Sequence, residues 1–161
     1  MKIGIVMGSY SDYKVVERAE KILIDFGVEF ETRIISAHRT PSVAEEFAKT
    51  AEDVGIEVII AAAGKAAHLG GVLAAYTPLP VIGLPIKSST LDGLDSLLSI
   101  VQMPKGVPVA TVAIDGAENA ALLAIQILSV KYSQLREAVI TYKHNMEREI
   151  IRADAEFREQ E

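Results

Sequence analysis

The chain has 161 residues, half of them hydrophobic and 6% aromatic, with no cysteine and a net charge of −6. This length favours one domain with a sizeable core. The absence of cysteine excludes disulfides, thiolate metal sites, iron–sulfur clusters and cysteine nucleophiles, and the acidic balance argues against non-specific binding to nucleic acid or to an anionic membrane.

Strand-like and helical segments alternate five times along the first 130 residues. The expected strands are residues 3–7, 28–35, 56–63, 81–85 and 107–114, and the expected helices are residues 12–26, 41–54, 71–76, 94–101 and 119–130. Short apolar runs indicate the strands, and apolar side chains that recur every three or four residues indicate the helices. This alternation predicts an α/β fold: a doubly wound parallel five-stranded sheet, in a three-layer sandwich of the Rossmann or flavodoxin type.

The two ends of the chain carry different signals. The N-terminus enters the first strand directly and lacks the regions of a signal peptide, and no apolar run is suited to span a bilayer. We therefore expect a soluble, cytoplasmic protein. At the other end, residues 132–161 carry one apolar stripe on an otherwise charged segment, formed by Tyr132, Leu135, Val139, Tyr142, Met146, Ile150, Ala153 and Phe157.

This stripe predicts a long helix with more apolar surface than one small domain can cover. We expect residues 1–131 to form the α/β domain, and residues 132–161 to form a helical arm of the same domain that packs partly on a neighbouring subunit. The alternative is a helix that folds back on its own domain.

The most informative stretch is residues 36–41, Ser-Ala-His-Arg-Thr-Pro, which follows the second strand. Thr40 suits the N-cap and Pro41 the first position of a helix. His38 and Arg39 should therefore lie at the carboxyl end of a strand, where open α/β sheets bind their ligands. The loops after the first and third strands should bring further polar residues to the same edge: Ser9, Ser11, Asp12, Lys65 and His68.

These loops suggest a ribose phosphate ligand. Gly8 and Ser9, just before a helix, offer backbone N–H groups and a hydroxyl to a phosphate, and Arg39 could add a bidentate contact. Asp12 would repel a phosphate but could accept hydrogen bonds from sugar hydroxyls. Each of these features also has a purely structural interpretation. The first loop could be only a turn and an N-cap, Arg39 could form a surface ion pair, and His38 could be a turn residue that is hydrogen-bonded to the backbone.

Several other site motifs are missing. Gly64 and Lys65 resemble the end of a Walker A loop, but Ala66 follows where Ser or Thr is needed, and Ile59 stands in place of the first glycine. There is no G-x-G-x-x-G after the first strand and no G-x-S-x-G elbow. The histidines and acidic residues show no metal-ligand spacing.

Four segments, in order, resemble the PurE family of N5-carboxyaminoimidazole ribonucleotide mutases: residues 7–12, 36–41, 66–69 and 91–104. The resemblance extends from the first strand to about residue 130. It implies an isomerase of purine biosynthesis that moves a carboxylate from the exocyclic nitrogen of an aminoimidazole ribonucleotide to ring carbon C4. It also implies a homo-octamer, no cofactor and no metal.

The resemblance assigns roles to residues of this chain. It implies that Ser9, Ser11 and Arg39 hold the phosphate, that Asp12 binds the ribose and that His38 is the general acid/base. The walls around the base and the carboxylate would be formed by Ser36, Gly64, Lys65, Ala66, His68 and Leu69.

One departure from the mutase pattern keeps a carboxylase open as an alternative. The mutases usually have Gly-Gly-Ala-Ala-His-Leu-Pro-Gly where this chain has Gly-Lys-Ala-Ala-His-Leu-Gly-Gly at residues 64–71. The related carboxylases, which use free CO2, resemble Gly-Arg-Ser-Asn there, so Lys65 places a cation where that branch has one. The other segments favour the mutase. Such a carboxylase is the first alternative, and a non-catalytic nucleotide- or flavin-binding module is the second.

Overall fold

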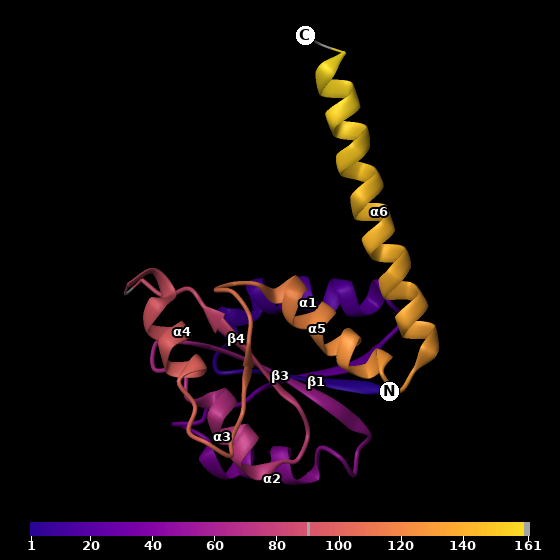
Figure 1. The fold of residues 1–161 in the computed structure, drawn as a ribbon. Helices are drawn as coiled ribbons and strands as arrows, with labels where there is room; N and C mark the ends of the chain where they lie inside the picture. Colours follow the sequence, from indigo (N-terminus) through magenta and orange to yellow (C-terminus); the bar gives the residue numbers. More distant parts are fainter. Residues whose placement is uncertain (90, 160–161) are drawn as a thin grey trace.

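The computed structural model describes residues 1–89 and 91–159, and in these residues one parallel sheet lies between two layers of helices (Figure 1). The strands of the sheet are β1 (Lys2–Met7), β2 (Glu29–Ile34), β3 (Ile56–Gly64), β4 (Val81–Ile86) and β5 (Ala110–Thr111). Their order is β2-β1-β3-β4-β5, and every pair is parallel. The predicted doubly wound sheet is confirmed.

Helices cover both faces of this sheet. Those in the described part of the chain are α1 (Tyr13–Asp25), α2 (Pro41–Thr50), α3 (Leu69–Tyr76), α4 (Leu94–Val101), α5 (Ala117–Ser129) and α6 (Ser133–Arg158), with short 3-10 turns at Tyr10–Asp12 and Leu91–Gly93. One apolar core joins α1 and α5 to the sheet, and a second joins α2, α3 and α4 to its other face. Figure 1 shows these two layers on opposite sides of the strands.

The central strands are apolar runs because both of their faces are buried. Every residue of β4 is buried, whereas β2, at the edge of the sheet, contains no fully buried residue. Gly83 of β4 lies so close to Ile100 of α4 that an added Cβ would collide with the isoleucine. This glycine lets α4 pack directly on the sheet.

The fifth strand is much shorter than the predicted 107–114. Only Ala110 and Thr111 form a regular ladder with β4. Pro108 has no N–H to donate, and the N–H of Val107 turns to the carbonyl of Pro104 (3.3 Å). The segment can therefore form only a short edge strand. Helix α2 is also shorter than predicted, since it ends at Thr50 rather than at residue 54.

The predicted C-terminal helix exists as α6. Leu135 is buried, and Tyr142 lies against Phe26 with 5.6 Å between ring centroids. Beyond this point the helix extends away from the rest of the chain (Figure 1) and exposes Ile150 and Phe157. It is therefore not folded back on its own domain over its full length. Thr90, between the predicted strand 81–85 and the predicted helix 94–101, and residues 160–161 of the predicted arm lie outside the described residues.

No described helix is both long enough and apolar enough to cross a membrane.

Candidate active site

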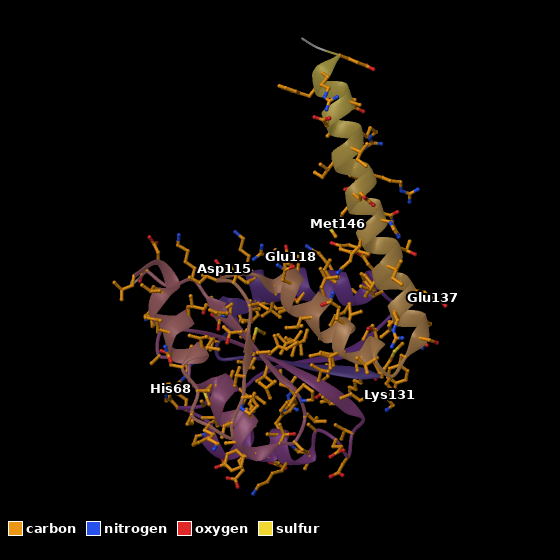
Figure 2. All side chains as sticks on the ribbon, in the orientation of Figure 1. His68, Asp115, Glu118, Lys131, Glu137 and Met146 are labelled. Carbon is orange, nitrogen blue, oxygen red and sulfur yellow. The ribbon has the colours of Figure 1, made fainter. Side chains whose placement is uncertain are left out.

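A cavity of about 620 Å³ lies at the carboxyl edge of the sheet, among the loops that follow β1, β2, β3 and β4. All eleven residues selected from the sequence line it: Ser9, Ser11, Asp12, Ser36, His38, Arg39, Gly64, Lys65, Ala66, His68 and Leu69. In Figure 2, His68 and Lys131, which precedes α6, lie at opposite ends of the sheet. The cavity and the base of the arm are thus at different ends of the strands.

The loop after β1 presents two hydroxyls and backbone N–H groups at the start of the Tyr10–Asp12 turn. The Ser9 hydroxyl caps this turn, because its oxygen accepts from the Ser11 N–H (3.3 Å), and the two serine hydroxyl oxygens lie 3.0 Å apart. An anion bound here would face N–H groups and hydroxyls at a helical N-terminus.

Arg39 bridges this loop and the loop after β2. Its Nη2 donates to the carbonyl of Gly8 (2.9 Å), and its Nε donates to the hydroxyl of Ser36 (3.2 Å). These contacts hold the guanidinium beside the Ser9 loop, and they use two of the five N–H donors of an arginine. The remaining donors suit a phosphate.

Thr40 is the N-cap residue of α2 and Pro41 begins the helix, as predicted, but the Thr40 side chain makes no capping hydrogen bond. Its Oγ1 instead accepts from the Ser36 N–H (3.0 Å) and donates to the Ser36 carbonyl (3.0 Å). The threonine thereby closes the loop of residues 36–40, which carries His38 and Arg39. Asp12 likewise precedes α1 without capping it.

Asp12 is a buried carboxylate at the wall of the cavity, only 8% exposed. Burial raises the pKa of Asp12 above its ordinary value of 3.8, although hydrogen bonds from Ser11 and the Ser9 backbone and the charge of Arg39 act in the opposite direction. A sugar with two hydroxyl donors would satisfy this carboxylate, and a phosphate would not.

Two histidines are in contact at the wall of the cavity. The Nε2 of His38 lies 2.8 Å from the Nδ1 of His68, and the rings meet edge to face with 4.9 Å between centroids. His38 follows β2 and His68 follows the end of β3, so the contact spans the end of β1. One of these nitrogens donates and the other accepts, so the contact fixes the relative orientation of the two rings at the cavity.

The fourth loop of the cavity, after β4, was missed from the sequence. Lys87, Ser88 and Ser89 line the cavity beside Ile86. The Lys87 N–H donates to Oδ1 of Asp115 (2.8 Å), and the Ser88 hydroxyl lies 3.2 Å from either carboxylate oxygen of Asp95. The available signal was position alone: these residues directly follow a predicted strand, as the other site residues do.

Comparison with known proteins adds a family match. The model of the family described as AIR carboxylase matches residues 2–149. The N5-carboxyaminoimidazole ribonucleotide mutase of Pyrococcus abyssi is 63% identical over 147 residues, which are 91% of this chain and 84% of that protein. The mutase of Mycobacterium tuberculosis is 51% identical over 156 residues, 97% of this chain and 90% of that protein.

Two further relatives extend the comparison. A phosphoribosylaminoimidazole carboxylase of Candida albicans is 56% identical over 149 residues, which are 92% of this chain but 26% of that protein. The crystal structure of PurE from Treponema denticola matches with a TM-score of 0.89 and 31% identity, and the match covers 96% of this chain and 97% of that one.

Proposed function

The chain belongs to the AIR carboxylase family, and we propose that it is an N5-carboxyaminoimidazole ribonucleotide mutase. This isomerase of purine biosynthesis converts N5-carboxyaminoimidazole ribonucleotide to 4-carboxy-5-aminoimidazole ribonucleotide. Identities of 51% to 63% to mutases, over more than nine-tenths of the chain, are the observation that carries the proposal.

The cavity is suited to such a ligand in size and chemistry. Its volume of about 620 Å³ is typical of small-molecule sites. Ser9, Ser11 and Arg39 bind the phosphate, and Asp12 accepts hydrogen bonds from the ribose. The base and the carboxylate lie against Ser36 and residues 64–69, where Ala66 and Leu69 supply apolar surface. This part of the proposal is supported by the position of all these side chains at one cavity.

The reaction requires one proton to be delivered and one to be removed. When the carbamate C–N bond breaks, CO2 leaves and the exocyclic nitrogen takes up a proton. Ring carbon C4 then attacks the CO2, a C–C bond forms and C4 becomes tetrahedral. Loss of the C4 proton returns its electron pair to the ring and restores aromaticity. Because the two proton transfers are opposite, one acid/base group can perform both.

His38 is the group we propose for these transfers. Imidazole exchanges protons near neutral pH, and His38 is held at the cavity by the Ser36–Thr40 loop and by its contact with His68. An enclosed site would also retain the CO2 between the two steps.

The assembly we propose is a homo-octamer in the cytoplasm, with the ribonucleotide as its small-molecule partner and no role for nucleic acid or membrane. The exposed apolar residues of α6, including Ile150 and Phe157, support a contact between subunits along the arm. Light scattering of the purified protein would test this assembly.

A carboxylase that uses free CO2 is the second candidate, favoured by Lys65 at the cavity and by the carboxylase of Candida albicans. The two activities separate when purified protein receives either the carbamate ribonucleotide or aminoimidazole ribonucleotide with bicarbonate. We expect 4-carboxy-5-aminoimidazole ribonucleotide to form rapidly from the carbamate. If the product forms only from aminoimidazole ribonucleotide with bicarbonate, and not from the carbamate ribonucleotide, the mutase assignment is wrong.

A further inference from the structure

Lys65 has an unusual backbone for a residue with a side chain. Its φ angle is +56°, in the left-handed region that glycine adopts without steric conflict and other residues rarely adopt. The residue directly follows β3 and lines the cavity. Strained non-glycine residues of this kind cluster at ligand sites, where the surrounding structure holds them in place.

The cations at the cavity fall into two groups. Arg39 lies between the loops after β2 and β1, where its guanidinium donates to the hydroxyl of Ser36 and to the carbonyl of Gly8. Lys65 and Lys87 follow β3 and β4. The strand order β2-β1-β3-β4 therefore places positive charge at two separate parts of the cavity. A ligand with two anionic groups would match this distribution.

The two lysines differ in whether their ammonium groups already form an ion pair with a carboxylate of the chain. The Nζ of Lys87 lies 3.2 Å from the carboxylate of Asp92. Within residues 1–89 and 91–159, by contrast, no carboxylate lies within ion-pair distance of Lys65. Lys65 is thus the lysine at this cavity whose charge can be taken up by a ligand.

We propose that Lys65 is a specificity-determining residue whose ammonium group binds the carboxylate of the ribonucleotide. The proposal rests on the proposed function, because it names the part of that ligand which Lys65 recognises. Arg39 and the Ser9 loop bind the phosphate, and Lys65 binds the second anion on the β3–β4 side.

The test compares two ribonucleotides that differ by one carboxylate. Calorimetric titration measures the affinity for 4-carboxy-5-aminoimidazole ribonucleotide and for aminoimidazole ribonucleotide, with the wild type, Lys65→Met, Lys65→Arg and Lys65→Gly. Lys105→Met removes an exposed charge away from the cavity and is the matched control.

We expect Lys65→Met to weaken binding of the carboxylated ribonucleotide about tenfold, the usual effect of losing a charge-assisted hydrogen bond. Binding of aminoimidazole ribonucleotide should be unchanged. Lys65→Arg should keep the preference for the carboxylate. Lys65→Gly should lose that preference and raise the melting temperature, because glycine relieves the strain.

Other results would overturn the proposal in distinguishable ways. If Lys65→Met weakens the binding of both ribonucleotides equally, or changes the binding of neither, Lys65 does not recognise the carboxylate. The proposed function then stands without this role for Lys65. If the wild type binds neither ribonucleotide, the proposed function fails, and the role of Lys65 fails with it.

Discussion

His38 and His68 are joined by one hydrogen bond, although they are 30 residues apart: 2.8 Å separates the Nε2 of His38 from the Nδ1 of His68. Such a bond needs one nitrogen that carries a proton and one that does not. The contact therefore links the tautomers of the two rings and fixes how the rings lie relative to one another at the cavity.

Replacement of His38 by Asn should lower kcat by about 100-fold or more, the usual contribution of a general acid/base. Binding of the ribonucleotide should persist, because the proposed phosphate contacts of Ser9 and Arg39 remain. Turnover assays and calorimetric titration measure the two effects. His144→Asn on α6 is the control and should keep normal turnover, since His144 is 67% exposed and paired with Glu147. Near wild-type turnover of His38→Asn would refute the acid/base role.

Replacement of His68 by Ala should lower kcat by about tenfold and change KM little, because it removes the partner that orients the His38 ring. Asn at this position can place an amide near the former Nδ1, so His68→Asn should recover part of the loss. Steady-state kinetics separate kcat from KM. A rise in KM with unchanged kcat would show that His68 acts only as part of the cavity wall and does not position His38.

Replacement of Arg39 by Lys should raise KM by about tenfold, because an ammonium cannot donate in the fork geometry of a guanidinium. Arg39 must reach both Ser36 and Gly8 while it faces the phosphate. Competition by ribose 5-phosphate, which lacks the base, should weaken in parallel. Arg33→Lys is the control, because Arg33 is exposed on β2 and pairs with Glu31. If ribose 5-phosphate competes equally well in Arg39→Lys and in the wild type, the phosphate does not bind at Arg39.

Replacement of Asp12 by Asn should raise stability at pH 7 while weakening ribonucleotide binding. Burial raises the pKa of Asp12 above 3.8 in the folded state, so the folded protein holds this proton more tightly than the unfolded chain. The stability of the wild type therefore falls as pH rises from 3.8 through the folded pKa, and the penalty persists above it. Thermal melts should show the gain of the variant at pH 7 and its disappearance as the pH falls below 3.8. If the variant is less stable than the wild type at neutral pH, the ionised Asp12 carboxylate does not destabilise the fold.

Replacement of Glu57 by Gln should destabilise the base of α6 by about 1 kcal/mol at pH 7, the upper range for partly exposed ion pairs. Glu57 accepts from Lys131 (2.9 Å) and from the hydroxyl of Tyr132 (2.7 Å). Although burial raises the pKa of Glu57, these hydrogen bonds lower it more, to a value below the ordinary 4.5.

This ion pair has a defined pH window. Because the folded pKa of Glu57 is lowered, its contribution to stability is complete above pH 4.5 and disappears as pH falls through the folded value. The difference in unfolding free energy between Glu57→Gln and the wild type should therefore shrink on acidification below pH 4.5. A difference that is constant with pH would show that the carboxylate charge contributes nothing here.

The strand ends were predictable because their signals are local. The apolar run before Ser36, and the Pro41 that starts α2, are visible within a few residues. Once the sheet was predicted to be parallel, its carboxyl edge had to collect the loops that follow the strands. The same reasoning applies to Lys87 and Ser88, which follow β4 at this edge but belong to no recognisable motif.

Hydrophobic periodicity and turn chemistry act over a few residues, so the amino-acid sequence alone predicts the alternation of strands and helices, the parallel sheet and the edge at which polar loops meet. Which side chains touch becomes visible only in the folded chain. The order β2-β1-β3 brings His38 to His68, the backbone at Lys65 adopts a left-handed conformation, and Thr40 closes a loop instead of capping a helix. The histidine contact joins residues 30 positions apart, which packing selects and local propensity does not encode. Thr40 and Ser36 are only four residues apart, and here the folded loop selects one of two local uses of the threonine hydroxyl.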